Sequence, residues 1–205
     1  MIRNKTLLWG LFITLLAIPT FLSLYYYIKL EESKRYAKFI IIEKDTRQLT
    51  IFDYQGIKLA AFEVGIGLNP GNKIKQGDMR TPEGVFPIVR IEEASTWEYD
   101  FKDDDVGPIK GAYGPWFLRL NVSDKELFSN SLNEREFTTY SEFKGIGIHG
   151  THDNSSIGTR VSKGCIRMRN HELEIIKQHA YIGMQVVILP SLADVTENYN
   201  PAITK

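Results

Sequence analysis

The sequence contains a single cysteine, Cys165, among its 205 residues. An intramolecular disulfide is therefore excluded, and a chain of this length is large enough to form an apolar core without one. A charge excess of either sign is also absent, because 25 basic residues balance 25 acidic residues. This balance gives no reason to expect a nucleic acid or another highly charged partner. The totals fit an ordinary globular protein of about one domain.

Charged residues are also missing from Thr6 to Ile28, and most of this stretch is apolar. A helix of this length crosses the hydrocarbon core of a bilayer, which is about 30 Å thick. Arg3 and Lys5 precede the stretch as in an export signal, and no cleavage site of small residues follows it. We therefore expect residues 1–29 to form a cytoplasmic N-terminus and an uncleaved signal anchor with one transmembrane helix.

A polar linker over residues 30–37 leads into many short apolar or alternating segments, which are typical of β-strands. The expected strands are Lys38–Glu43, Gln48–Phe52, Ile57–Val64, Val85–Ile91, Trp116–Asn121, Gly145–His149 and Gln185–Leu189. The segment from Gly65 to Glu83 is rich in glycine, asparagine and proline, and it predicts a loop.

One helix is expected near the C-terminus of this region. Asn170 is a typical N-cap residue, and Leu173, Ile176 and Ala180 then form an apolar stripe at helical spacing. Many strands and few helices predict a mainly β domain over residues 38–190, either a β-sandwich or an open barrel with one or two short helices. Residues 191–205 are expected to form a C-terminal tail.

The segment from Ile146 to Met168 carries the residues suited to chemistry. A cysteine becomes nucleophilic as its thiolate, which needs a nearby base or cation. His149 ends a predicted strand and Cys165 lies sixteen residues later, so the two meet if their strands are neighbours. Gly164 lets the backbone approach a reacting carbonyl, and the amides around Gly164 and Cys165 are candidates for an oxyanion hole. Arg167 shares a face with Cys165 in an extended segment and suits a carboxylate.

These residues resemble the signature of the L,D-transpeptidase (YkuD) family. The resemblance rests on a His-Gly-Thr element within Ile148–Thr151 and on the cysteine element Ser162–Met168. Thr81–Gly84 resembles the Thr-Pro-x-Gly loop of the family, and the similarity extends from about Lys38 to Leu189. It implies an L,D-transpeptidase-like β fold and makes residues 38–190 the catalytic domain.

The resemblance also implies an activity, which is peptidoglycan L,D-transpeptidation. Cys165 would attack the carbonyl between an L-centre and a D-residue of a stem tetrapeptide, and the terminal D-alanine would leave. An amine acceptor, giving a 3→3 cross-link, or water would then take the acyl group. The implied catalytic residues are Cys165, His149 and Gly164. The implied substrate-binding residues are Arg167, Thr151, Ser162 and Lys163.

The same resemblance implies peptidoglycan stem peptides as partners, with neither a cofactor nor a metal. Together with the predicted anchor, it places the protein as a single-pass protein of the inner or cytoplasmic membrane. Its catalytic domain is then expected in the periplasm or another extracytoplasmic space.

Lys163 departs from the family pattern, in which a histidine often stands two residues before the cysteine. A lysine is a poor proton shuttle near neutral pH, so the departure assigns proton transfer to His149. Three aromatic residues are interpreted as packing residues, with a substrate groove as the alternative; they are Trp97, Tyr113 and Trp116.

Three other functions stay open at this point. A sortase-like protein transpeptidase also uses cysteine, histidine and arginine, although a glycine before the cysteine is foreign to its motif. A silent peptidoglycan-binding module would need no nucleophile. A metal-dependent amidase would draw on His149, His152, Cys165 and Asp153, but these lack the paired short spacings of typical zinc sites.

Overall fold

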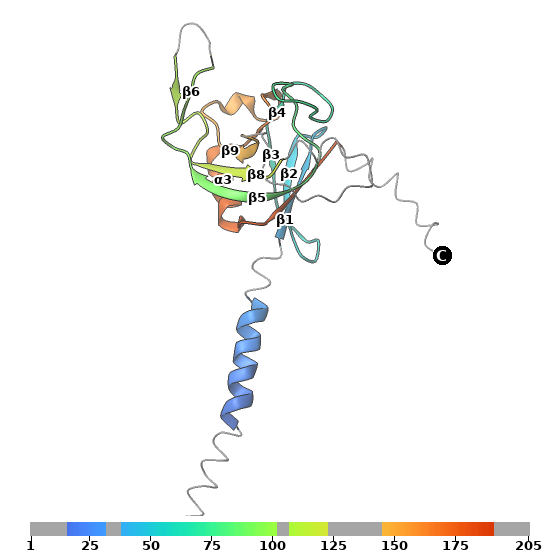
Figure 1. The fold of residues 1–205 in the computed structure, drawn as a ribbon, viewed down its shortest axis with the longest axis vertical. Helices are drawn as coiled ribbons and strands as arrows, with labels where there is room; N and C mark the ends of the chain where they lie inside the picture. The colour runs from blue at the N-terminus through green and yellow to red at the C-terminus, as the bar shows by residue number, and fades with distance from the viewer. Residues whose placement is uncertain (1–15, 32–37, 102–106, 123–144, 191–205) are drawn as a thin grey trace, which may run out of the picture. The chain divides into compact units, whose positions relative to one another are not determined.

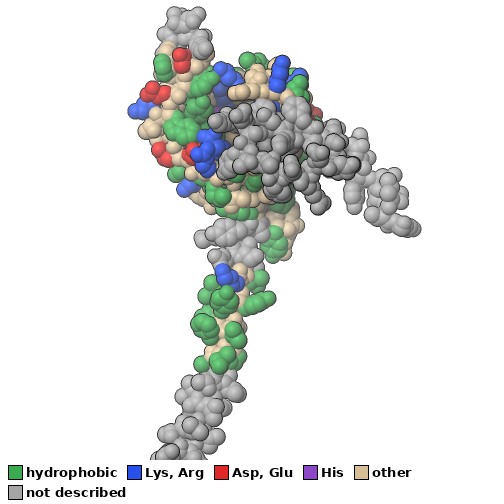
Figure 2. Space-filling view, viewed as in Figure 1, with side chains coloured by type: hydrophobic (Ala, Val, Ile, Leu, Met, Phe, Trp, Pro, Cys, Tyr) green, Lys and Arg blue, Asp and Glu red, His purple; other side chains and the backbone are tan. Residues whose placement is uncertain are grey.

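The computed structural model describes residues 16–31, 38–101, 107–122 and 145–190. The chain divides into two compact units, residues 1–37 and residues 38–205. In the first unit, residues 16–31 form one helix whose side chains are all exposed. Figure 2 shows hydrophobic side chains over most of the visible face of this helix.

The predicted membrane span is only partly covered by the described residues, since residues 6–15 lie outside them. Among the described helices, none is both long enough and apolar enough to cross a bilayer. Residues 32–37 of the predicted linker and the whole predicted tail, 191–205, also lie outside the described residues. The anchor, the linker and the tail therefore stay predictions.

The second unit is built on one eight-stranded sheet with the strand order β11-β9-β8-β5-β12-β1-β2-β3 (Figure 1). Its strands are β1 (Lys38–Glu43), β2 (Gln48–Asp53), β3 (Lys58–Glu63), β5 (Gly84–Glu93), β8 (Trp116–Leu120), β9 (Gly147–His149), β11 (Ile166–Arg167) and β12 (Gln185–Leu189). Two small ribbons flank it, one of β4 (Ile66–Gly67) with β10 (Arg160–Ser162) and one of β6 (Glu98–Tyr99) with β7 (Ile109–Lys110). The described residues of this unit also form the helix α3 (Asn170–His179) and the 3₁₀ turn η1 (Asn154–Ser156).

The core follows from the alternation of side chains along the strands. Ile40 and Ile42 in β1 and Val186 and Ile188 in β12 are fully buried, and the two strands run parallel in direct register. Helix α3 adds its apolar stripe to the same core, where Leu173 and Ile176 are fully buried. Burial of each such side chain stabilises the fold by about 1.5–3 kcal/mol.

Strand β5 decides the shape of the sheet. Its first half pairs with β12 and its second half with β8, and the register shifts between Ile88 and Arg90. Such an irregularity bends a strand and increases its twist. The sheet accordingly curls into a half-barrel (Figure 1), so the open-barrel alternative is right and the sandwich of two packed sheets is wrong.

The seven predicted strands are all present, with bounds that differ by at most two residues. The predicted loop from Gly65 to Glu83 also contains the short strand β4. The predicted N-cap is wrong, because Arg169 occupies the cap position and Asn170 is the first helical residue. The Asn170 side chain accepts a hydrogen bond from the Thr151 N–H at 2.9 Å instead, which joins α3 to the segment after His149.

Candidate active site

The site is built on the three neighbouring strands β8, β9 and β11. One row of residues across them is fully buried in the core and consists of Leu118, Ile148 and Ile166. Because side chains alternate between the two faces of a sheet, the next row points to the opposite face. That row consists of Phe117, His149 and Arg167. Cys165 immediately precedes β11, so Cys165 and Arg167 share this second face.

A cavity of about 870 Å³ lies over this face. Five of the seven predicted site residues line it, and they are Cys165, His149, Arg167, Ser162 and Lys163. Gly164 and Thr151 are not among the lining residues. The parallel pairing of β11 with β9 is what brings Cys165 and His149 to one cavity.

Cys165 is half-buried, and its Sγ donates a hydrogen bond to the carbonyl oxygen of Gly145 at 2.9 Å. Burial raises the pKa of the thiol, and this effect outweighs the opposing hydrogen bond from the Gly147 N–H and the nearby charge of Arg167. Gly147 also has to be a glycine, because a Cβ there would collide with the Phe117 ring and would lie 2.6 Å from the Leu118 oxygen. Because burial raises its pKa above the ordinary value, the Cys165 thiol is protonated at neutral pH.

His149 is almost fully buried, and its ring is stacked on Phe117 at 5.4 Å between centroids with an interplanar angle of 7°. Its Nδ1 lies 2.6 Å from the carbonyl oxygen of Gly150. A carbonyl only accepts, so Nδ1 carries the proton and Nε2 is left as the basic nitrogen. Burial lowers the pKa of His149 to about 4, which keeps the imidazole neutral at neutral pH.

A neutral thiol beside a neutral imidazole predicts a particular pH dependence. We expect the rate of Cys165 alkylation by iodoacetamide to rise about tenfold per pH unit from about pH 6 to about pH 9, without a plateau. The reason is that the thiolate fraction keeps growing below the raised pKa of the thiol. Stopped-flow or mass-spectrometric rates over this range measure it. A rate that is flat across the range would instead reveal a preformed thiolate–imidazolium pair.

Arg167 provides a cation in the same cavity. Its guanidinium carbon lies 5.8 Å from the centroid of the Phe101 ring, and burial lowers its pKa from the ordinary value. The backbone of Arg167 is held by two hydrogen bonds to Gly65, of 2.8 and 2.9 Å. Within the ranges that the structure describes, no carboxylate lies within ion-pair distance of this guanidinium.

Lys163 is exposed on the cavity rim, where its Nζ donates to the Tyr99 hydroxyl at 2.6 Å. This contact ties the ribbon of β6 and β7 to the segment that precedes Cys165. The Lys163 ammonium thus connects two walls of the cavity. It makes no hydrogen bond to Cys165.

Thr151 and Gly164 hold the backbone around the cavity. The Thr151 hydroxyl accepts the Asp153 N–H at 3.0 Å and donates to the Asp153 carbonyl at 3.1 Å. The Gly164 N–H donates to Ser162 Oγ at 3.0 Å, and Ser162 Oγ donates to the Cys165 carbonyl at 2.6 Å. The Gly164 N–H therefore already has a partner in Ser162 Oγ, and the Cys165 N–H is the candidate oxyanion donor.

The sequence raised only part of the aromatic wall of the cavity, since Trp97 and Tyr113 were given as groove residues in the alternative to packing. The wall consists of Trp97, Tyr99, Phe101, Tyr113 and Phe117. Tyr113 contacts the His149 ring edge-on at 4.9 Å, and burial raises its pKa to about 12. Trp97 and Tyr113 line the cavity as well as packing on each other, whereas Trp116 lies apart and donates to Glu174 at 2.9 Å. In the sequence, the clustering of aromatic residues between positions 97 and 117 could have indicated this wall.

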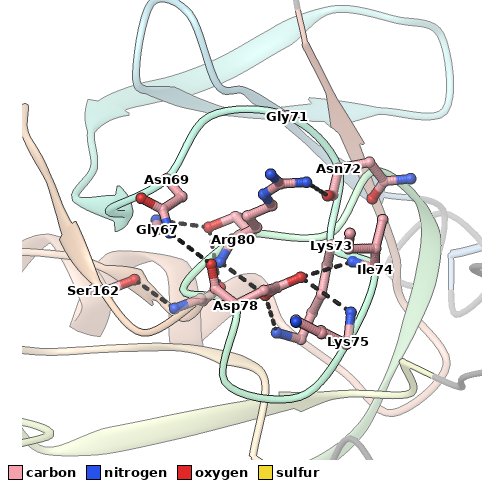
Figure 3. Close-up of polar contacts among 12 residues, drawn as sticks. Gly67, Asn69, Gly71, Asn72, Lys73, Ile74, Lys75, Asp78, Arg80 and Ser162 are labelled. Atoms are coloured by element: carbon pink, nitrogen blue, oxygen red, sulfur yellow. Dashed lines mark hydrogen bonds and ion pairs between the residues drawn. The ribbon is translucent and has the colours of Figure 1, made fainter.

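A second part of the cavity lining comes from the loop of residues 72–80, shown in Figure 3. Asp78 organises it, because its carboxylate accepts from Lys73 Nζ at 2.7 Å and from the backbone N–H groups of Ile74, Lys75 and Arg80 at 2.7 to 3.1 Å. These four bonds hold the pKa of Asp78 far below its ordinary value, although burial acts in the opposite direction. Lys73, Gln76 and Gly77 reach the cavity from this loop.

The metal-dependent amidase alternative requires a cluster of side chains that can hold an ion. Among the described residues, no group of three or more His, Cys, Asp or Glu side chains is arranged to hold an ion. His149, His152, Cys165 and Asp153 all lie in the described part of the chain. The His152 ring instead contacts the Phe101 ring, with 5.2 Å between the ring centroids.

Comparison with known proteins agrees with this fold. The family model of the YkuD L,D-transpeptidase catalytic domain matches residues 37–188, a range that extends from before β1 into β12. The chain belongs to the YkuD family of L,D-transpeptidase catalytic domains. The resemblance of the sequence is thereby confirmed, and the sortase-like alternative is set aside.

Individual relatives give the extent of the similarity. The "Probable L,D-transpeptidase ErfK/SrfK" of Escherichia coli K12 is 45% identical over 155 residues, which are 74% of this chain and 44% of that protein. A Salmonella typhimurium protein of the same name matches over 14% of its length, so the chain spans less than half of either relative.

Two solved structures share the fold. "L,D-transpeptidase 3 from Mycobacterium tuberculosis in complex with a faropenem-derived adduct" has a TM-score of 0.51 at 14% identity, with 74% of this chain and 60% of that chain covered. An L,D-transpeptidase from Mycobacterium smegmatis has a TM-score of 0.50 at 16% identity, with coverages of 75% and 58%.

Proposed function

We propose that the domain is a peptidoglycan L,D-transpeptidase whose nucleophile is Cys165. The observation that carries the proposal is the presence of the thiol, a neutral histidine base and the Arg167 cation on one face of the same cavity. Membership in the YkuD family supports the same reaction. A stem tetrapeptide is the donor, and its carbonyl between the L-centre and the D-residue is the point of attack.

Acylation uses His149 as a general base. Nε2 of His149 takes the proton of Cys165 Sγ as the sulfur attacks the carbonyl carbon, and negative charge develops on the carbonyl oxygen. The C–N bond to the terminal D-alanine then breaks, and the departing amine receives the proton from the imidazolium. The products of this half-reaction are a thioester on Cys165 and free D-alanine.

The second half-reaction transfers the acyl group. An acceptor amine loses a proton to His149 and attacks the thioester carbon, and the C–S bond breaks to return the protonated thiol. With the side-chain amine of a neighbouring stem the product is a 3→3 cross-link, whereas with water it is a trimmed peptide. Arg167 holds a carboxylate of the stem, because a guanidinium binds a carboxylate through two parallel hydrogen bonds.

We also propose an extracytoplasmic location, in which the uncharged stretch Thr6–Ile28 anchors the domain in the cytoplasmic membrane. Support comes from the sequence, since an uncharged stretch of this length suits the bilayer core and basic residues precede it. Stem peptides of peptidoglycan are found on that side of the membrane. Membrane fractionation of the full chain, with protease accessibility of the domain, tests this location.

Removal of metal ions by a chelator distinguishes the proposed enzyme from a metal-dependent amidase. We expect the rate of D-alanine release from a stem tetrapeptide to be unchanged, within about twofold, by excess EDTA, because proton transfer and nucleophilic attack both belong to side chains here. Release of D-alanine before and after dialysis against EDTA measures it. Loss of activity that zinc restores would favour the amidase.

Mass spectrometry of the products tests the proposed function. The protein is incubated with a defined disaccharide tetrapeptide, and the muropeptides are separated and fragmented. We expect loss of D-alanine together with dimers joined 3→3, or with tripeptides when water is the acceptor. A silent binding module would leave the tetrapeptide intact, and cleavage at any other bond would contradict the proposal.

A further inference from the structure

Two hydroxyl groups bind the backbone of Gly164, one at its N–H and one at its carbonyl oxygen. Gly164 has a φ of +130°, and a Cβ at this position would lie 2.7 Å from the Arg80 carbonyl oxygen and 3.0 Å from Ile146 Cδ1. Only glycine adopts this conformation in so little space. Ser162 Oγ binds the Gly164 N–H, whereas the Gly164 carbonyl oxygen accepts a hydrogen bond from Thr81 Oγ1 at 3.0 Å.

The Thr81 hydroxyl is fully buried, and it both accepts and donates a hydrogen bond. It accepts the Gly67 N–H at 2.8 Å, and it donates its proton to the Gly164 carbonyl oxygen, which has no proton of its own to give. Thr81 precedes Gly164 by 83 residues and is not among the residues that line the cavity. Thr81 therefore contacts the segment of Cys165 from outside the cavity.

A trans peptide directs its N–H and its C=O to opposite sides. The peptide unit between Gly164 and Cys165 contains both the Gly164 carbonyl and the Cys165 N–H. Since the carbonyl points to the buried Thr81, the Cys165 N–H points away from Thr81, on the side where Cys165 lines the cavity. A hydrogen bond accepted by the carbonyl also strengthens the N–H of the same peptide as a donor.

We propose that Thr81 is a positioning residue, which orients and polarises the Cys165 N–H as the oxyanion donor of acylation. The inference deepens the proposed function and rests on it, because an oxyanion forms only if Cys165 is acylated. Gly164 cannot supply this donor, since its own N–H is bound to Ser162. The loss of one such donor commonly slows acyl transfer by about 10²–10³-fold.

The backbone of Thr81 is fixed independently of its hydroxyl. Lys44 is buried, and its Nζ donates to the Thr81 carbonyl at 3.0 Å, to the Gly71 carbonyl at 2.6 Å and to the Glu83 carboxylate at 2.6 Å. Asp78 holds the preceding turn through the contacts drawn in Figure 3. Removal of the hydroxyl should therefore leave the Thr81 backbone in place, while the Gly164 carbonyl and the Gly67 N–H each lose their bond to Thr81 Oγ1.

The test compares two reactions of the same thiol in the wild type and in Thr81→Val, Thr81→Ala and Thr81→Ser. Acylation by a carbapenem passes through an oxyanion, whereas alkylation by iodoacetamide displaces iodide and forms none. We expect Thr81→Val, and Thr81→Ala should the valine variant fail to fold, to slow acylation by about 10²-fold while alkylation stays within about twofold. Thr81→Ser keeps the hydroxyl, so both of its rates should stay within a few-fold of the wild type.

Each possible result of this test either supports or overturns the proposed role of Thr81. Equal loss of both rates in the hydroxyl-free variants would mean that Thr81 only holds Cys165 in place, and no loss of acylation would mean that its hydroxyl is not needed; either result overturns the inference. A selective loss in Thr81→Ser would overturn it as well. If the wild type itself is alkylated but never acylated, the proposed function fails instead, which keeps the two claims separate.

Discussion

Replacement of Cys165 by alanine should abolish acylation by a carbapenem and by a stem tetrapeptide, while the domain still folds. In the wild type the sulfur attacks the strained β-lactam carbonyl, the C–N bond of the ring opens and its nitrogen takes up the thiol proton. Cys165 is the only cysteine, so Cys165→Ala leaves no thiol to replace it. Because the side chain is half-buried at a cavity, the free energy of unfolding should change by about 1 kcal/mol or less.

Intact-protein mass spectrometry with excess carbapenem measures this result, with circular dichroism as the check on folding. A matched control is Val161→Ala, which shortens another side chain of the cavity lining but leaves the nucleophile untouched. The control should gain one drug per chain. An adduct on folded Cys165→Ala, or turnover of tetrapeptide by it, would remove the central role of this residue.

Replacement of His149 by alanine is expected to slow acylation of Cys165 by about 10²–10⁴-fold, which is the usual contribution of a general base. The neutral thiol cannot attack without giving up its proton, and His149 Nε2 is the basic nitrogen that the cavity offers. Lys163→His should stay within a few-fold of the wild type, because Lys163 contacts Tyr99 rather than the thiol. Single-turnover acylation rates near neutral pH measure both effects.

His149→Asn is the control for this experiment, since its side-chain amide can still donate to the Gly150 carbonyl but offers no basic nitrogen. It should be as slow as His149→Ala, and both variants should recover rate as the pH is raised and the thiol ionises. A fully active His149→Ala enzyme would identify another base. Lys163 would then be the first residue to replace.

The sequence predicted those features that depend on local patterns. Strands such as Lys38–Glu43 and Gln185–Leu189 were predicted with their observed bounds, because an unbroken apolar run between polar turns specifies a buried strand without reference to distant residues. The cysteine and histidine were found because both lie within a motif of about twenty residues. Their meeting in one cavity depends on the pairing of β9 with β11, which joins residues close in sequence.

Features that depend on distant contacts were missed. The curl of the sheet depends on the register shift within β5, and the sequence of that strand did not distinguish a half-barrel from a sandwich. Asn170 has the chemistry of an N-cap, but its amide oxygen binds Thr151 in the folded chain. The hydrogen bond from Thr81 to Gly164 joins two motifs that are 83 residues apart, so neither motif alone indicates it.

The most direct test of the central claim is the mass of the protein during its reaction with a stem tetrapeptide. Rapid acid quenching followed by intact-protein mass spectrometry should show a transient gain equal to the tetrapeptide less one D-alanine, and peptide mapping should place it on Cys165 as a thioester that hydroxylamine removes. A gain that retains the terminal D-alanine, an adduct on another residue, or release of D-alanine without any acyl-enzyme on Cys165 would contradict the account.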